Sequence, residues 1–351
     1  KALTLYQKLL NNQRSNSYYF LRVIECHQQL GQYKAAQKEI ETQIKRSNYP
    51  QNLVELGYNY QLQNQQIEAN SYYEKAIQSI EIQPNYIYAV AQRFEDHSLI
   101  DYAIQAYEMG LQKAPNDAFY YQLAGLYATQ QNIEKMMERY LDYVETNPPY
   151  ISQVMRLLTE YISDDASQPY NQLFKKVLLK KLQTKPNPLW NQWLSWLYVQ
   201  QNDFKKAFVQ EKAVYRRTPE SLQGLINLAL LAQEAQSYDM AISVFEFIIQ
   251  NTKEPRLRIQ ANSSRLELQL EQSEPGNYKE IKAQYEALLE TYKLGIETVV
   301  LQLSYAQFLA FYDQNPEAAI TFLKTALKAN LTDLASSELK MKLADILVTQ
   351  N

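Results

Sequence analysis

The sequence contains very little cysteine, histidine or glycine. Its 351 residues include one cysteine, two histidines and 7 glycines. A single cysteine excludes an internal disulfide and a cysteine-based zinc site. Cys26 lies among apolar neighbours in a helical pattern, so we expect a small buried residue and not a reactive thiol. Strands and tight turns use glycine, so a content of about a third of the ordinary frequency favours helices joined by short polar turns.

The chain also lacks long apolar runs and an excess of positive charge. No apolar segment approaches the ~20 residues of a membrane-spanning helix. The net charge of −3 does not suit a phosphate-binding surface, so we expect no nucleic-acid partner. The most basic stretch, Leu173–Lys181, places its lysines on the solvent side of an amphipathic helix. An acidic partner is the alternative to plain solvation there.

The sequence does contain a repeat. The segments Ala69–Pro84 and Ala103–Pro115 carry matching small and aromatic residues at an offset of 34 residues. The upstream half of each unit has apolar residues at the helical period of 3.6, so each unit predicts two amphipathic helices that pack as an antiparallel pair. Stacked pairs bury one continuous core. The position of the small residue is occupied by Ala36, Ala69, Ala103, Met136, Ala207 and Ala241. Four positions later stand Ile40, Tyr73, Tyr107, Tyr140, Glu211 and Phe245, of which only Glu211 is not a large apolar side chain.

This pattern resembles the tetratricopeptide repeat (TPR) family over essentially the whole chain. The best copy reads Leu53, Leu56, Gly57, Tyr60, Asn64, Ala69, Tyr73 and Ala76. The resemblance implies an all-α, right-handed α-solenoid of about nine helix-turn-helix repeats and about 19 helices. Most of the family's turn glycines are replaced here, so we expect looser turns. Both ends lack polar capping units, which predicts a segment of a longer bacterial TPR protein.

Two stretches depart from the repeat. Tyr161–Asn171 carries two acids, serine, glutamine and proline where a short turn is expected. We predict a longer loop there, and a bend between an N-terminal solenoid half of residues 1–163 and a C-terminal half of residues 164–351. The stretched unit of residues 256–294 uses Glu271–Asn277 as its turn.

Groups suited to catalysis are scarce. Cys26 and His27 are adjacent on a helix, so their side chains diverge by ~100° and cannot form a thiolate–imidazole pair. His97 lies at a predicted turn, where we expect a capping or solvated role. Acidic pairs at turns cap helices more often than they catalyse. No phosphate-binding loop and no metal-ligand spacing occurs, so we expect neither an enzyme nor a cofactor.

The resemblance also implies that the first helix of each pair lines a concave groove. Tyr offers rigid contact area and Gln donates and accepts hydrogen bonds, which suits an extended peptide or a partner helix. No Lys or Arg occupies the positions that we assign to this face, so we do not expect the clamp for a terminal carboxylate that some family members use. The candidate residues are Tyr18, Glu25, Gln28, Tyr58, Gln61, Tyr88, Gln92, Tyr121, Gln192, Trp196, Gln200 and Gln233.

Three tryptophans form the sharpest local feature. Trp190, Trp193 and Trp196 are spaced three apart and fan across ~120° of one helix. We expect this fan to pack in the core, with Trp196 at its solvent edge. An exposed tryptophan is a frequent binding hot spot.

The sequence therefore favours a non-catalytic scaffold that binds a protein or extended peptide within a larger assembly. One alternative is a glycan- or cell-wall-binding solenoid, since Trp, Tyr and Gln also suit sugar faces and hydroxyls. Another is the non-catalytic part of a longer enzyme. The Tyr-, Asn- and Gln-rich repeats are similar to exported repeat proteins of AT-biased Gram-negative bacteria, so we expect an envelope assembly in the periplasm, with the cytoplasm as the alternative.

Overall fold

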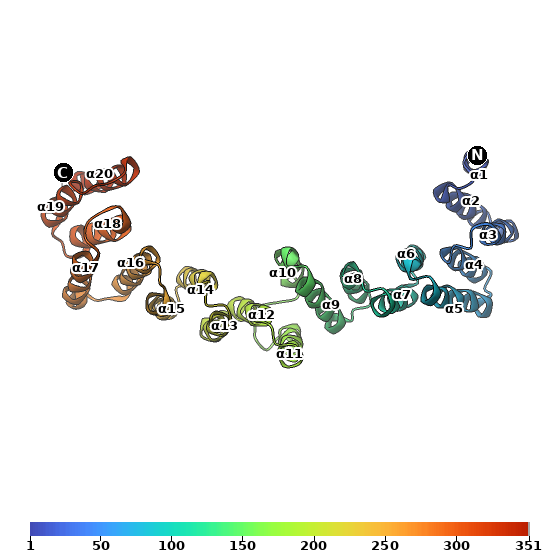
Figure 1. Ribbon diagram of the computed structural model, residues 1–351, viewed down its shortest axis with the longest axis horizontal. Coiled ribbons are helices and arrows are strands. Elements are labelled where there is room, and N and C mark those ends of the chain that lie inside the picture. The colour runs from blue at the N-terminus through green and yellow to red at the C-terminus, as the bar shows by residue number, and fades with distance from the viewer. Residues whose placement is uncertain (350–351) are drawn as a thin grey trace. The chain divides into compact units, whose positions relative to one another are not determined.

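A computed structural model describes residues 1–349, which form two compact helical units (Figure 1). The first unit spans Lys1–Glu160 and the second begins at Tyr161. The described residues contain twenty α-helices and no strand, which confirms the all-α prediction. The first unit holds α1 (Ala2–Asn12), α2 (Ser17–Gln29), α3 (Tyr33–Ser47), α4 (Gln51–Gln61), α5 (Gln66–Ile82), α6 (Ile87–Asp96), α7 (Ile100–Lys113), α8 (Ala118–Thr129), α9 (Ile133–Thr146) and α10 (Ile151–Thr159). The second holds α11 (Pro169–Thr184), α12 (Pro188–Gln200), α13 (Phe204–Arg217), α14 (Gln223–Glu234), α15 (Tyr238–Asn251), α16 (Pro255–Gln272), α17 (Tyr278–Tyr292), α18 (Val299–Gln307), α19 (Pro316–Ala326) and α20 (Asp333–Val348).

Helices pack in consecutive pairs because small side chains let their backbones approach. The predicted small residues Ala36, Ala69, Ala103, Ala207 and Ala241 are all fully buried. In the pair formed by α4 and α5, Tyr73 lies so close to Gly57 that a Cβ atom on the glycine would be 2.5 Å from Tyr73 Cε1. The repeat spacing therefore located the helix–helix contacts correctly.

The tryptophan fan packs on α12 as the spacing predicts. Trp190 and Trp193 are fully buried, whereas Trp196 is half-buried. Phe174 of α11 meets both Trp193 and Trp196 edge-on, with ring centroids 5.8 Å and 6.1 Å away. The fan is thus a core feature with one partly exposed edge.

The turn inside each pair is tight and left-handed, so the expectation of looser turns is wrong. A residue with positive φ stands five positions before the small residue in each of six pairs. The following backbone N–H then donates to the carbonyl five residues back at 2.8 to 3.0 Å, the Schellman arrangement that ends helices. Backbone hydrogen bonds hold this shape whether or not the residue is glycine. The six positions are Gly31, Asn64, Ser98, Gln131, Asn202 and Gln236.

The two departures from the repeat occur where the sequence predicts them. Helix α10 ends at Thr159 and α11 begins only at Pro169. The Asn171 amide donates to the carbonyls of Ser163 and Asp165 at 2.8 Å and 2.7 Å, which orders part of this longer loop. The second long turn follows α16 and contains a 3₁₀ turn over Pro275–Asn277.

Cys26 is only partly buried, contrary to the prediction. The buried stripe of α2 contains Val23, Ile24, His27 and Gln28, and Cys26 lies at the border of that stripe.

Within residues 1–349, no helix is both long enough and apolar enough to cross a membrane.

Candidate binding pocket

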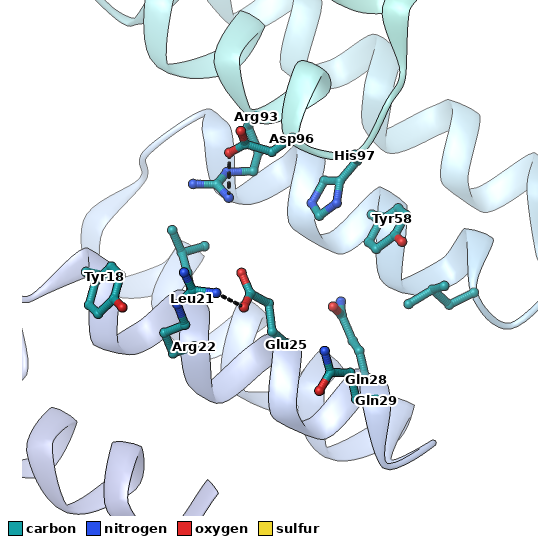
Figure 2. Close-up of a pocket in the computed structure, with 11 residues that line it drawn as sticks. Tyr18, Leu21, Arg22, Glu25, Gln28, Gln29, Tyr58, Arg93, Asp96 and His97 are labelled. Carbon is teal, nitrogen blue, oxygen red and sulfur yellow. Dashed lines mark hydrogen bonds and ion pairs between the residues drawn. The ribbon is translucent and has the colours of Figure 1, made fainter. Parts of the chain in front are cut away.

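The first helices of three successive pairs, α2, α4 and α6, surround a pocket in the first unit (Figure 2). Its volume is about 570 Å³. Four residues that the sequence predicts for the groove lie together here: Tyr18, Glu25, Gln28 and Tyr58. The remaining lining residues are Leu21, Arg22, Gln29, Leu62, Arg93, Asp96 and His97.

Two arginine–carboxylate pairs face each other across the pocket. On α2, Arg22 Nη1 lies 2.6 Å from Glu25 Oε2. On α6, Arg93 Nη1 lies 3.1 Å from Asp96 Oδ2, and Figure 2 shows the two pairs on opposite walls. Each pair joins residues three positions apart on one helix, so the geometry is local to that helix.

Arg22 and Arg93 line the pocket, although neither occupies a position that the sequence assigns to the inward face. The long arginine side chain reaches a pocket from the flank of a helix, while we counted only positions that point straight inward. One signal was available in the sequence. Arg22 follows Tyr18 by four residues, a spacing that puts both on one helix face, and its Cζ lies 5.1 Å from the Tyr18 ring centroid.

A buried carboxylate supports one wall of the pocket. Glu55 of α4 is 2% exposed, and its Oε1 lies 3.0 Å from His97 Nε2 and 3.1 Å from Arg93 Nε. A carboxylate in such a position requires charged or hydrogen-bonding partners, because burial removes its hydration. Arg93 of α6 and His97, the residue directly after α6, supply them, which ties two repeats together.

His97 is the C-cap residue of α6, as its place at a turn predicts, but its side chain is only 10% exposed and is not solvated. Its ring stacks on Tyr58 with centroids 3.8 Å apart and planes 15° apart. His97 is the residue that directly follows α6, and from there its side chain extends back to α4. The sequence does not show this contact because Glu55 and His97 are far apart in the chain.

Gln28 is the one predicted groove residue that is deeply buried in the pocket wall. It is 7% exposed, and its Nε2 has no hydrogen-bond partner. A buried amide donor without a partner costs free energy comparable to a lost hydrogen bond. Because Gln28 lines the pocket, a turn of its amide toward the cavity would let this group donate to an oxygen atom of a bound molecule.

The other predicted groove residues of the first unit make contacts outside this pocket's lining. Gln61 accepts a hydrogen bond of 2.9 Å from the Tyr73 hydroxyl. Tyr88 is half exposed and meets the Tyr107 ring edge-on. Gln92 Nε2 donates to Asp96 Oδ1 over 3.4 Å, just beyond the lining. The ring of Tyr121 packs against those of Tyr140 and Tyr143.

The candidates of the second unit belong to other surroundings. Gln192 lines a separate cavity of about 330 Å³ together with Glu211 and Gly224. Burial raises the pKa of Glu211 even though a hydrogen bond with Ser195 opposes the shift. Trp196 packs in the tryptophan fan, and Gln200 and Gln233 are partly exposed.

Arg22 in the pocket lining and Glu95 beside it both have a displaced pKa. Hydrogen bonds with Tyr18 and Glu25 raise the pKa of the Arg22 guanidinium. Burial raises the pKa of the Glu95 carboxyl, and the hydrogen bond of 2.9 Å from the Tyr107 hydroxyl only partly opposes that effect. Across residues 1–349, no three His, Cys, Asp or Glu side chains are grouped in a way that could hold a metal ion. The pocket thus offers amide, aromatic and paired charged groups to a ligand.

Neither a protein-family model nor a curated protein matches the sequence. Solved structures do match it. They include yeast Tom70, with 13% identity over 99% of this chain and 85% of that chain and a TM-score of 0.34. A tetratricopeptide repeat protein from Parabacteroides merdae matches with 14% identity over 85% of this chain and 100% of that chain, at a TM-score of 0.28. The TPR domain of P58(IPK) matches with 13% identity over 99% of this chain and 93% of that chain, at a TM-score of 0.26.

At these identities and TM-scores the likeness concerns the helical repeat and extends no further. In its helical-repeat fold, this chain is similar to tetratricopeptide repeat proteins.

Proposed function

We propose that this chain is a non-catalytic scaffold that binds a protein or an extended peptide in the pocket between α2, α4 and α6. The observation that carries the proposal is the convergence of Tyr18, Glu25, Gln28 and Tyr58 from successive first helices on one open pocket. A volume of about 570 Å³ falls in the range of ligand sites and accommodates a few residues of a partner chain.

The chemistry of the pocket favours binding over catalysis. Its imidazole, His97, is stacked on Tyr58 and lies against Glu55, so it supports the wall and activates no nucleophile. The amides of Gln28 and Gln29 suit the backbone of a peptide, which offers alternating donors and acceptors.

We further propose that the chain acts within a larger assembly of the cell envelope, in the periplasm.

The test places a photo-crosslinking amino acid at Gln29, which is exposed and lines the pocket, in the full-length protein in its native host. The matched control carries the same amino acid at Lys38, an exposed position on the second helix α3. We expect a polypeptide joined to position 29 and none joined to position 38.

Mass spectrometry of the crosslinked product then identifies the bound segment and its compartment. Equal labelling at both positions, or a product that contains only glycan, would refute the peptide-binding proposal. A glycan product would instead support the cell-wall alternative.

A further inference from the structure

We infer that the pocket selects a cationic side chain of the partner, Arg or Lys, and that Gln28 receives the neighbouring backbone carbonyl. This inference rests on the proposed function and names the chemistry that the same pocket recognises. Two independent observations carry it: an imbalance of charge around the pocket and the unpartnered amide of Gln28.

The charges around the pocket do not cancel. The lining carboxylates Glu25 and Asp96, together with the buried Glu55 behind the wall, stand against two guanidinium groups, Arg22 and Arg93. A surplus carboxylate in a concave site attracts a cation and repels an anion.

The position of each charge shows which carboxylate is in surplus. Glu55 is almost fully buried, where an ionic interaction is less screened than at the surface, so the charge of Arg93 mainly balances Glu55. Arg22 and Glu25 balance each other on α2. Asp96, whose side chain is 42% exposed, then keeps an accessible and incompletely balanced charge at the pocket wall.

Aromatic rings add to the attraction for a cation. The Tyr18 ring is 52% exposed and already has the Arg22 guanidinium 5.1 Å from its centroid. A ligand cation between the walls gains from the same electron-rich ring and from the carboxylates of Glu25 and Asp96. An anionic side chain would have to displace these carboxylates from their arginines.

Gln28 accounts for the second half of the recognition. Its Nε2 is buried and without a partner, so a turn of the amide toward an acceptor oxygen in the pocket restores a missing hydrogen bond. A backbone carbonyl beside the bound side chain provides such an oxygen, whereas an isolated cation does not. The pocket therefore favours a cation on a polypeptide over a free cation.

Small probes test both halves with the full-length protein. N-acetyl-arginine methylamide carries the cation and the carbonyl, N-acetyl-citrulline methylamide is its neutral isostere, and methylguanidinium lacks the carbonyl. Binding is measured by saturation-transfer NMR. We expect the arginine probe to bind about tenfold more tightly than the citrulline probe, as loss of a charge-assisted contact predicts.

Two variants assign the contacts. Asp96→Asn should weaken the arginine probe about tenfold, while Asp117→Asn, which removes an exposed carboxylate outside the pocket lining, should leave it unchanged. Gln28→Leu should weaken the arginine probe and leave methylguanidinium unaffected. Urea unfolding of each variant shows that it is folded.

Equal binding of the arginine and citrulline probes, or no binding of any probe, overturns the inference. A crosslinked partner whose pocket-bound segment lacks Arg and Lys also overturns it and leaves the scaffold proposal intact. If the arginine probe binds the pocket but no polypeptide is crosslinked at Gln29, the scaffold proposal is refuted and the cation site remains supported.

Discussion

Replacement of glutamine by glycine at two inter-helix turns should stabilise this protein. Gln131 and Gln236 have φ values of 58° and 57°, the left-handed region that side chains with a Cβ atom adopt at a cost of about 1–2 kcal/mol. Both side chains are exposed, so their removal takes no packing from the core.

The magnitude follows from two opposing effects. Glycine removes the left-handed strain, but it also increases the conformational entropy of the unfolded chain, which costs about 0.4–1 kcal/mol. The net gain should be about 0.5–1 kcal/mol for Gln131→Gly and again for Gln236→Gly. Asn64→Gly and Asn202→Gly should gain little, because asparagine tolerates this conformation.

Urea unfolding followed by circular dichroism measures the effect as a higher midpoint at an unchanged slope. Repeat arrays need not unfold in one step, so hydrogen exchange of the turn amides should localise the gain to the substituted repeat. Gly31→Ala, with φ 69° at the equivalent turn, should destabilise by about 0.5–1 kcal/mol, because the same two effects act in reverse. Unchanged midpoints for both glutamine variants, together with a neutral Gly31→Ala, would refute the idea that these turns are strained.

Three further perturbations follow from the packing. Gly57→Ala should destabilise the protein by about 1–3 kcal/mol, because the new Cβ atom would lie 2.5 Å from a buried atom of Tyr73. Gly125→Ala lies in a helix with open space around it and should stabilise the protein by about 0.5–1 kcal/mol. Thermal unfolding of the two variants compares these effects. Glu211→Gln should raise the urea midpoint at pH 7, because burial raises the pKa of the Glu211 carboxyl in the folded protein. The contribution of this carboxyl to stability is fully present below its ordinary pKa of 4.5 and is lost as pH rises through the folded pKa, so the difference between the two proteins should vanish below pH 4.5. Arg93→Met should lower the free energy of unfolding by about 3 kcal/mol, because it leaves the buried Glu55 without its guanidinium partner. Adding Glu55→Leu should recover most of that loss. If the effects of the two substitutions simply add in the double variant, the two residues are not coupled.

Much of the fold could be predicted because its determinants are local in the sequence. Small residues such as Ala69 and Ala103 recur at a fixed spacing, and each marks a helix–helix contact one repeat apart. The turns were the exception. Their glycines are mostly absent, yet the backbone hydrogen bonds that end a helix impose the same left-handed shape on Gln131 and Asn64.

The pocket could be predicted only in part. Tyr18 and Gln28 follow from the repeat register, since both lie on the first helix of a pair. Arg93 and His97 do not, because one reaches the pocket from the flank of its helix and the other from the residue that directly follows it. Positions counted as inward-facing say where a Cβ atom points, and they do not say where the end of a long side chain lies.

By itself, the sequence determined that this chain is a helical repeat with paired amphipathic helices, because periodicity and helix–helix register are encoded within single repeats. Only the tertiary structure decided the charge of the pocket. Glu55 and His97 lie 3.0 Å apart although 42 residues separate them. Such a contact arises from the stacking of whole repeats and from the need of a buried carboxylate for partners, and neither is visible in the spacing of residues along the chain.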